Sequence, residues 1–319
     1  MGRKGWAWTI IGVLFVLMIV VFVVKDTQLT GENIFNKWEE QLVEGSGNGK
    51  IVQLSVDGVI TQSTDMFSTN IFNSDEFISQ LDQVIHDESV KAVVIQVNSP
   101  GGEVVASDEI HSKILEVKQA GKPVIISMGA MAASGGYYIS AQADRIFANP
   151  NTLTGSLGVI FTIPNYQKLA DWLGYKENVI KSGQLKDIGN PLRELTKEEQ
   201  QIFQKLVDES YQQFVDIIAN GRQLPREQVL KIADGRVYSG RQAKELKLID
   251  EFGSLADATQ YAIKKAGLEN ARVIRYSRSV TFKSLLTGVN QRTDDSVLNM
   301  LQQLPKVSSE PRLLYLYQS

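Results

Sequence analysis

The sequence predicts an α/β protein in which buried strands alternate with amphipathic helices. Near-continuous apolar runs at 92–97 and 123–128 are typical of strands that are buried on both faces, as in a parallel sheet. A helical period of apolar residues fills 75–87, and another pattern of this kind starts at Glu103. Strand and helix patterns in alternation indicate an α/β architecture with much parallel pairing.

The remaining elements follow from local patterns. The segment 51–56 alternates like a strand and is followed by Asp57-Gly58, which favours a turn. A long amphipathic helix is expected at 196–222, because Thr196 and Glu199 have the spacing of a capping box. Further strands are expected at 145–148, 176–181 and 272–276, and further helices at 225–233, 240–246 and 254–266.

The N-terminal region contains an uncharged apolar run at 6–24, long enough to cross a bilayer as a helix. Arg3 and Lys4 precede it, so the positive-inside rule predicts a cytoplasmic N-terminus and an extracytoplasmic remainder. A cleaved signal peptide is the alternative, but no small-x-small cleavage site follows the run. We therefore expect an uncleaved, single-pass anchor.

The chain divides into four expected parts. Residues 1–25 form a cytoplasmic stub and the anchor, and 26–49 form a polar linker that ends in a Gly-rich spacer. Residues 50–280 are expected to be the catalytic domain. Residues 281–319 are a polar extension that ends in an apolar tail.

Composition excludes several classes of chemistry. The chain has no cysteine, which removes disulfides, thiolate nucleophiles and cysteine metal sites. Its 2 histidines, His86 and His111, lie in amphipathic helical patterns and cannot form a three-histidine zinc site. No metal or cofactor is therefore expected. A net charge of −3 without a basic tract argues against nucleic acid as a partner.

A candidate nucleophile, Ser134, lies in the stretch 129–138, where an apolar strand pattern turns into a helix pattern. Ala and Gly flank it, so a peptide backbone could approach closely. The N-terminus of the helix would present N–H groups to an oxyanion. The alternative is that Ser134 only caps the helix, and for an isolated serine this alternative is the more common. This turn is not the G-x-S-x-G elbow of α/β-hydrolases, because Ala132 stands at the position of the first glycine.

Two other Gly-rich turns border predicted strands. The turn at 98–103 contains Gly101 and Gly102 and could direct an N–H towards an oxyanion. A phosphate-binding turn is an alternative that lacks the expected Lys-Ser/Thr pair, and a plain tight turn remains open. The other turn, at 154–159, contains Ser156.

Because histidine is scarce, a lysine is the expected base for a serine nucleophile. It would need enough desolvation to lower its pKa by roughly three units from about 10.4. Lys186 has the best local context, in a Gly-rich loop after a strand pattern, although Asp187 beside it would favour the charged form. The residues alone leave the choice of lysine open.

Taken in order, these motifs resemble signal peptide peptidase A of the half-length bacterial type. The resemblance covers about 50–278 and rests on blocks at 98–102, 131–138, 155–159, 182–187, 235–243 and 248–250. It implies a fold of the Clp-peptidase and crotonase kind, built from repeated ββα units. It also implies a Ser134–Lys186 dyad supported by Ser156, with backbone N–H groups of Gly101 and Gly135 for the oxyanion.

The resemblance further implies a homo-oligomeric ring in which the two dyad residues can come from neighbouring subunits. It implies degradation of residual signal peptides at the outer face of the bacterial cytoplasmic membrane. Because the sequence indicates no nucleotide site, ATP is expected to be unnecessary. The segment Leu313–Tyr317 is hypothesised to lie in a neighbour's groove as a substrate mimic. Apolar subsites for the peptide are expected from Gly102, Val104, Met131, Leu157 and Val159, for which ordinary core packing is the alternative.

Two other functions remain open from the sequence. A crotonase-type acyl-CoA enzyme would share the fold, but it has no need of a membrane anchor. A catalytically inactive membrane scaffold would keep the ring, but the intact Ser134–Lys186 pair argues against it.

Overall fold

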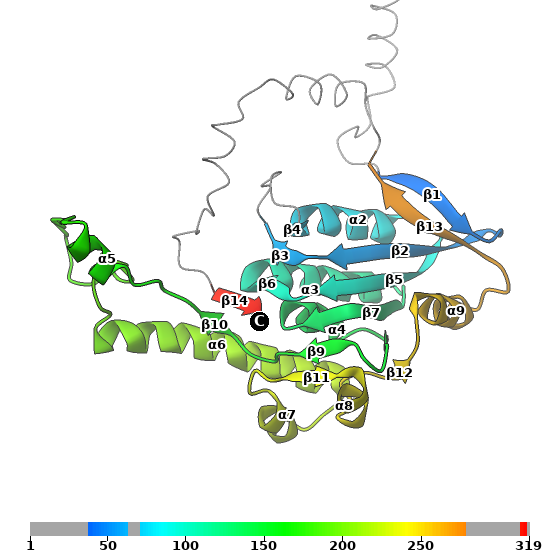
Figure 1. Cartoon of the computed structure of the whole chain (residues 1–319). Coiled ribbons are helices and arrows are strands. Elements are labelled where there is room, and N and C mark those ends of the chain that lie inside the picture. Colours follow the sequence, from blue (N-terminus) through cyan, green and yellow to red (C-terminus); the bar gives the residue numbers. More distant parts are fainter. Residues whose placement is uncertain (1–37, 63–70, 279–312, 318–319) are drawn as a thin grey trace, which may run out of the picture. The chain divides into compact units, whose positions relative to one another are not determined.

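The computed structural model describes residues 38–62, 71–278 and 313–317. Strands and helices alternate along most of this part of the chain, which confirms the α/β prediction (Figure 1). The apolar run at 6–24 lies outside the described residues. Among those described, no helix is long and apolar enough to span a membrane.

The larger sheet is mostly parallel. Its strands run in the order β1-β13-β2-β5-β7-β8-β12, and β9 extends it by pairing with β7 and with β11. The bounds are β1 Glu39–Glu44, β13 Ala271–Ser277, β2 Gly49–Asp57, β5 Val90–Ser99, β7 Val124–Ala133, β8 Arg145–Ala148, β12 Glu251–Phe252, β9 Leu153–Gly155 and β11 Val237–Ser239.

Two hydrophobic clusters cover the two faces of this sheet. In β5, the side chains of Val93 and Ile95 belong to the larger cluster, and that of Val94 belongs to the smaller one. This alternation is the two-residue period of a strand, and it confirms that β5 is buried on both faces. The larger cluster includes α2 Ser74–His86, α3 Val104–Gln119, α4 Gly135–Ser140 and α6 Lys197–Arg222, and the smaller one includes α9 Leu255–Lys265.

A smaller, second sheet contains strands that are distant in sequence. Its order is β10 Ile160–Phe161, β14 Leu313–Leu316, β6 Gly101–Glu103, β3 Val59–Thr61 and β4 Ile71–Asn73. β14 therefore lies between β6 and β10, and it is antiparallel to both. Figure 1 shows β14 in red beside these two strands.

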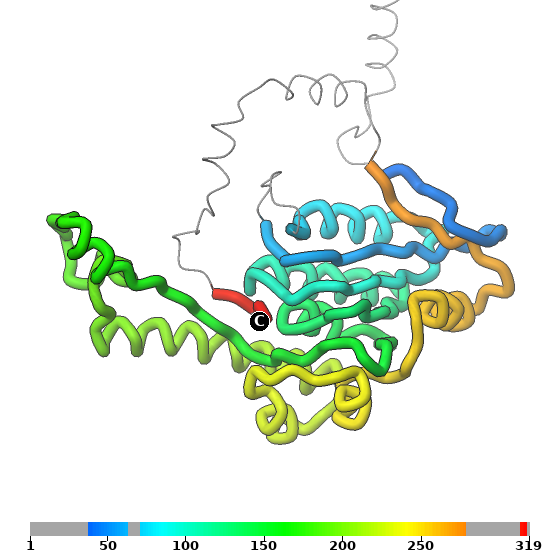
Figure 2. The backbone as a smooth tube through the Cα atoms, viewed as in Figure 1, coloured from blue at the N-terminus to red at the C-terminus, as the bar shows by residue number. Residues whose placement is uncertain are grey.

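An arm extends from the body of the domain. It consists of the segment after β10, α5 Gln167–Trp172, the connection from α5 to α6, and the first half of α6 (Figure 2). The rings of Phe161 and Phe203 pack at 4.7 Å and join the two sides of the arm at its base. A capping box of Thr196 and Glu199 starts α6, as predicted. Two short helices, α7 Arg226–Ile232 and α8 Gly240–Glu245, follow α6.

The structure differs from the sequence-based expectations at two places. No strand forms at 176–181; every side chain there is exposed, and none of the strands in the described part of the chain pairs with it. The expected linker 26–49 contains β1, which joins the large sheet beside β13. All six residues of β1 are exposed, so no alternation of buried and exposed positions marks this strand in the sequence.

Candidate active site

Ser134 occupies a strained position between β7 and α4. Its φ of 51° is unusual for a residue other than glycine, and such outliers concentrate at functional sites. Its N–H donates to the carbonyl of Gly155 at 2.8 Å, and its own carbonyl accepts the N–H of Tyr138 at 2.8 Å. The side chain makes no capping hydrogen bond to α4, although only 1% of the residue is exposed. The helix-cap alternative therefore fails, and the hydroxyl group is not committed to holding the helix.

Gly101 and Gly135 come into close contact beside this serine. Gly101 has φ of 105°, and a Cβ atom there would lie 2.6 Å from the nitrogen of Gly135. The N–H of Gly135 opens α4 and has no partner within the helix. The N–H of Gly101, by contrast, donates to Ser99 Oγ at 3.0 Å. The expectation that Gly101 supplies an oxyanion donor is thus not met in this arrangement, because its N–H is bonded within its own turn.

Ser156 lies next to Ser134 because β9 pairs with the end of β7. Ala133 is opposite Gly155 in the register, so the two serines follow paired residues. Ser156 also has φ of 51°, and its N–H donates to the backbone carbonyl of Arg236 at 2.8 Å. Ser156 lines a cavity of about 400 Å³ together with Val159 and Leu316. The structure therefore brings together two of the predicted site residues, both in strained backbone conformations.

Lys186 is not part of this cluster within one chain. It belongs to the connection between α5 and α6, and Figure 1 shows this connection at the outer end of the arm, away from α4. Its side chain is exposed, and its backbone N–H closes a turn onto Gly183. One chain alone therefore does not assemble the predicted dyad.

The carboxylate beside Lys186 is held by other cations. Asp187 accepts hydrogen bonds from Lys181 at 2.6 Å and from Arg193 at 3.3 Å. These bonds, first that of Lys181, lower the pKa of Asp187 to about 2. A hydrogen bond from Arg193 likewise lowers the pKa of Glu199 to about 2. These four residues form an ionic cluster that links the loop to the start of α6.

A desolvated lysine does occur in the fold, at Lys122. Its ammonium is buried and donates to the carbonyls of Val84, Ile85 and Asp87 at the end of α2. Burial lowers the pKa of Lys122. Lys122 precedes β7, however, whereas Ser134 follows this strand of 10 residues, so about 30 Å separate the two. Lys122 caps the carbonyl groups at the C-terminal end of α2, and it is too far from Ser134 to act as its base.

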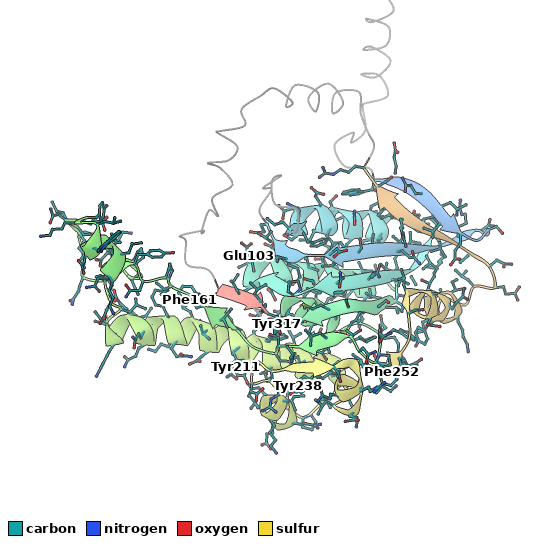
Figure 3. The ribbon with its side chains drawn as sticks, viewed as in Figure 1. Glu103, Phe161, Tyr211, Tyr238, Phe252 and Tyr317 are labelled. Carbon is teal, nitrogen blue, oxygen red and sulfur yellow. The ribbon has the colours of Figure 1, made fainter. Side chains whose placement is uncertain are left out.

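A groove between β6 and β10, beside Ser134 and Ser156, holds an extended segment of the chain itself. Tyr315 of β14 is opposite Gly102 of β6, and Leu314 is opposite Ile160 of β10. The N–H of Tyr317 adds a hydrogen bond of 2.9 Å to the carbonyl of Pro100. Tyr211 of α6, labelled in Figure 3, lines the same cavity as Leu316 of this segment. The segment Leu313–Tyr317 thus lies in a groove as predicted, but the groove belongs to its own chain.

The other expected peptide-binding residues differ in their positions. Gly102 pairs with the segment, and Val159 lines the cavity beside Leu316. Val104 is half-buried against the main core, and Met131 is half-buried on β7. Leu157 is fully buried and belongs to the same hydrophobic cluster as Tyr315 of the segment.

Sequence reasoning missed an aromatic cluster at the groove. The ring of Tyr315 stacks on that of Tyr138 at 4.7 Å and packs against that of Phe214 at 4.9 Å. Tyr138 lies in the sequence motif that contains Ser134. No sequence pattern in α6 or in the C-terminal segment predicts that Phe214 or Tyr315 would contact it. The rings of Tyr138 and Phe214 pack at 5.1 Å, and the pairing of β14 with β6 brings Tyr315 to them.

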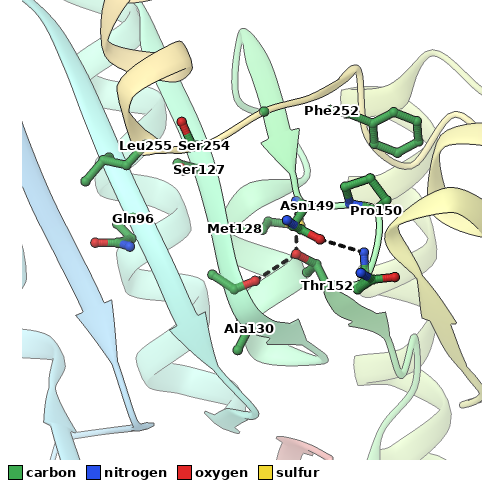
Figure 4. Close-up of a pocket in the computed structure, with 13 residues that line it drawn as sticks. Gln96, Ser127, Met128, Ala130, Asn149, Pro150, Thr152, Phe252, Ser254 and Leu255 are labelled. Carbon is green, nitrogen blue, oxygen red and sulfur yellow. Dashed lines mark hydrogen bonds between the residues drawn. The ribbon is translucent and has the colours of Figure 1, made fainter.

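A larger cavity, of about 750 Å³, lies elsewhere on the sheet. It is lined by β7 residues before Ala132 and by the turns at 149–152 and 252–255 (Figure 4). Thr152 donates to the carbonyl of Gly129 at 2.8 Å and accepts the N–H of Asn149 at 3.1 Å. Neither Ser134 nor Lys186 lines this cavity. Among the described residues, no group of three or more His, Cys, Asp or Glu could hold a metal ion.

Comparison with known proteins defines the class. The model of peptidase family S49 matches residues 116–269, and that of the Clp protease family matches 56–154. A protein of Enterococcus faecium named as a signal peptide peptidase SppA is 38% identical over 97% of this chain and 98% of its own length. Protease 4 of Haemophilus influenzae is 38% identical over 67% of this chain and 34% of its own. The chloroplastic serine protease SPPA of Arabidopsis thaliana is 31% identical over 84% of this chain and 41% of its own.

These relatives and the fold identify a serine peptidase with a Clp-protease-like α/β architecture. The chain belongs to peptidase family S49.

Proposed function

We propose that this chain is a membrane-anchored endopeptidase in which Ser134 and Lys186 form the catalytic dyad. Its substrates are residual signal peptides and other apolar peptides at the outer face of the bacterial cytoplasmic membrane. The observation that carries the proposal is the strained Ser134 beneath a groove that already accommodates an extended peptide segment. Residues 6–24 supply the anchor and hold the groove near the bilayer.

The reaction is acyl transfer to serine followed by hydrolysis. Neutral Lys186 removes the proton of the Ser134 hydroxyl, and the oxygen bonds to the carbonyl carbon of the substrate. The N–H of Gly135 stabilises the oxyanion. The C–N bond then breaks, and the leaving amine takes the proton from Lys186. Water hydrolyses the acyl-enzyme with the same lysine as base, and Ser156 orients that lysine.

We propose that the dyad forms between subunits of a homo-oligomeric ring. The separation of Lys186 from Ser134 within one chain supports this proposal. The arm that bears Lys186 also exposes several large apolar side chains, among them Trp172 at 81% and Leu173 at 64%. The concentration of large exposed apolar side chains on one arm supports an interaction site there. A neighbouring copy of the chain would cover these side chains and receive Lys186 at its own Ser134.

Mixing of two inactive variants tests the dyad and its location together. Full-length Ser134→Ala and Lys186→Ala are purified in detergent, and each is expected to hydrolyse a fluorogenic apolar peptide at background rate. Subunits from both variants, unfolded and reassembled together, should recover about a quarter of the unmodified activity, because one interface in four combines an intact serine with an intact lysine. No recovery, with assembly confirmed by sedimentation, would place the dyad within one subunit.

A serine-reactive probe separates this function from its alternatives. A peptidase with an activated nucleophile is labelled at Ser134, as read by peptide mass spectrometry. An inactive scaffold or an acyl-CoA enzyme would leave Ser134 unlabelled.

A further inference from the structure

A row of polar side chains crosses the larger sheet on the face that carries α9. In the parallel register, Ser55 of β2 is opposite Gln96 of β5, which is in turn opposite Ser127 of β7. Two residues earlier on the same face, Val94 and Ile125 are buried in the smaller hydrophobic cluster with α9. A strand that is covered on both faces is expected to be apolar along its length. The polar row therefore marks a part of the sheet that is not built as hydrophobic core.

This row contributes to the lining of the cavity of about 750 Å³ (Figure 4). Gln96 and Ser127 line the cavity from the sheet, and only 2% of Ser127 is exposed. In the described part of the chain, no group forms a hydrogen bond with either side chain. A buried hydroxyl group without a partner costs free energy, and a ligand in the cavity would supply the missing hydrogen bond. The volume is within the range of small-molecule sites.

The 13 lining residues carry no charged side chain. Their polar groups are amides, from Gln96, Asn149 and Asn151, and hydroxyls, among them Ser127. The turn that bears Asn149 is held by its own contacts, since its side-chain oxygen accepts the N–H of Asn151 at 2.9 Å. A lining of this kind cannot offset the desolvation of a charged ligand. It favours a neutral ligand with many hydrogen-bonding groups.

Phe252 adds an aromatic ring to the lining, and 44% of this residue is exposed. The ammonium of Lys244, which does not line the cavity, lies 5.4 Å from the centroid of the ring. Lys244 also donates to the carbonyl of Asp250 at 2.5 Å, so the cation that contacts the ring is itself held in place. An exposed ring beside amide and hydroxyl groups suits a sugar, because a pyranose has an apolar C–H face and polar edges.

We propose that this cavity binds a neutral pyranose sugar. Phe252 packs against the C–H face of the sugar, and Gln96, Ser127 and Asn151 form hydrogen bonds with its polar groups. Neither Ser134 nor Lys186 lines the cavity, so the site is separate from the proposed dyad. The sugar site goes beyond the proposed peptidase function and does not depend on it.

Binding of free sugars to the full chain tests the proposal. The protein is purified in a detergent without a sugar head group, and saturation-transfer NMR follows titrations with two matched pairs of sugars. Glucose and N-acetylglucosamine are neutral, whereas glucuronate and glucosamine are their charged counterparts. The neutral sugars should bind with Kd on the order of 1 mM, as expected for ligands of this size. The charged ones should bind at least about 10-fold more weakly, because no lining residue pairs with the charge.

Two substitutions locate the bound sugar. Phe252→Ala removes the ring, and Ser127→Ala removes one hydrogen bond, so each should weaken binding by roughly 2- to 12-fold. Ser127→Ala should not lower Tm, because the hydroxyl group has no partner in the protein. The matched control is Leu230→Ala, which changes an exposed apolar side chain of α7 outside the cavity and should leave the Kd unchanged. Absence of binding, equal affinity for charged and neutral sugars, or binding unaffected by both lining substitutions would overturn the proposal.

Two further measurements separate this site from the proposed function and from an interface between copies. Ser134→Ala should bind sugars like the unmodified chain, so a failure of the peptidase proposal leaves the sugar test intact. Phe252→Ala should sediment like the unmodified chain. If this variant instead forms smaller assemblies and no sugar binds, the cavity is a contact between copies of the chain and the sugar site is refuted.

Discussion

The groove and the arm differ in how completely one chain builds them. At the groove, Ser134, Gly135 and the aromatic cluster are buried, and backbone hydrogen bonds hold both strained serines. On the arm, Lys186 is exposed, and the surrounding segment is held mainly by ion pairs at the surface. A nucleophile and its binding cleft are thus preformed, whereas the proposed base is displayed on a surface. The difference supports the proposal that a second copy of the chain completes the site.

The largest expected effect comes from the dyad itself. Ser134→Ala and Lys186→Ala should each reduce kcat by at least about 10³-fold, because a nucleophile and its base act as a unit. Neither should lower Tm, since Lys186 is exposed and the Ser134 side chain holds no helix cap. Lys176→Ala, an exposed lysine of the same connection, is the matched control and should keep full activity. Activity retained by Lys186→Ala would mean that another group is the base.

Substitution at Gly101 tests the close backbone contact in the groove. Gly101→Ala would place a Cβ 1.9 Å from the carbonyl of Tyr315 and 2.6 Å from the nitrogen of Gly135. It should displace β14 and reduce activity strongly, with a loss of about 2–4 kcal/mol in the free energy of unfolding from strain and the clash. Gly121 also has positive φ, but nothing lies within 4 Å of a Cβ there. Gly121→Ala should cost about 1 kcal/mol by denaturant titration and leave activity intact. Similar results for both variants would argue against the groove geometry.

Polar substitution on the arm should separate assembly from folding. Trp172→Ser and Ile180→Ser change large, exposed apolar side chains, so the free energy of unfolding of one chain should change by no more than about 0.5 kcal/mol. Sedimentation velocity should show smaller assemblies, and peptide hydrolysis should fall in parallel. Normal assembly in both variants would mean that the arm is not the interface.

Acid should loosen the arm before it affects the groove. Asp187 and Glu199 have pKa values lowered to about 2 by their partners, first Lys181 and Arg193 respectively. The stability that they contribute is complete above their ordinary pKa values of roughly 4 and is lost as the pH falls towards 2. Hydrogen exchange of 181–199, read by mass spectrometry, should therefore increase below about pH 4. Arg193→Ala should shift this increase to higher pH, and an unchanged profile would contradict the ionic cluster.

Sequence patterns anticipated most of the fold because local rules dominate there. The apolar run at 92–97 became β5, and the spacing of Thr196 and Glu199 became the capping box of α6. β1 has no buried face, so its sequence lacks the alternation of apolar and polar residues that predicts a strand. The strand expected at 176–181 had the right composition but no neighbouring strand. The composition of a segment does not show whether another strand lies beside it to pair with.

For the site, the sequence by itself determined which residues stand at the turns: Ser134 and Ser156 after strands, with glycines beside them. These are local requirements of a sharp turn. Only the tertiary structure decided that Ser99 binds the N–H of Gly101, that Tyr315 stacks on Tyr138, and that the connection bearing Lys186 lies on the arm, apart from α4. The stacking of Tyr315 and the position of Lys186 depend on how segments distant in sequence pair or separate. The hydrogen bond of Gly101 depends on the orientation of one N–H. Local sequence propensities carry no information about these features.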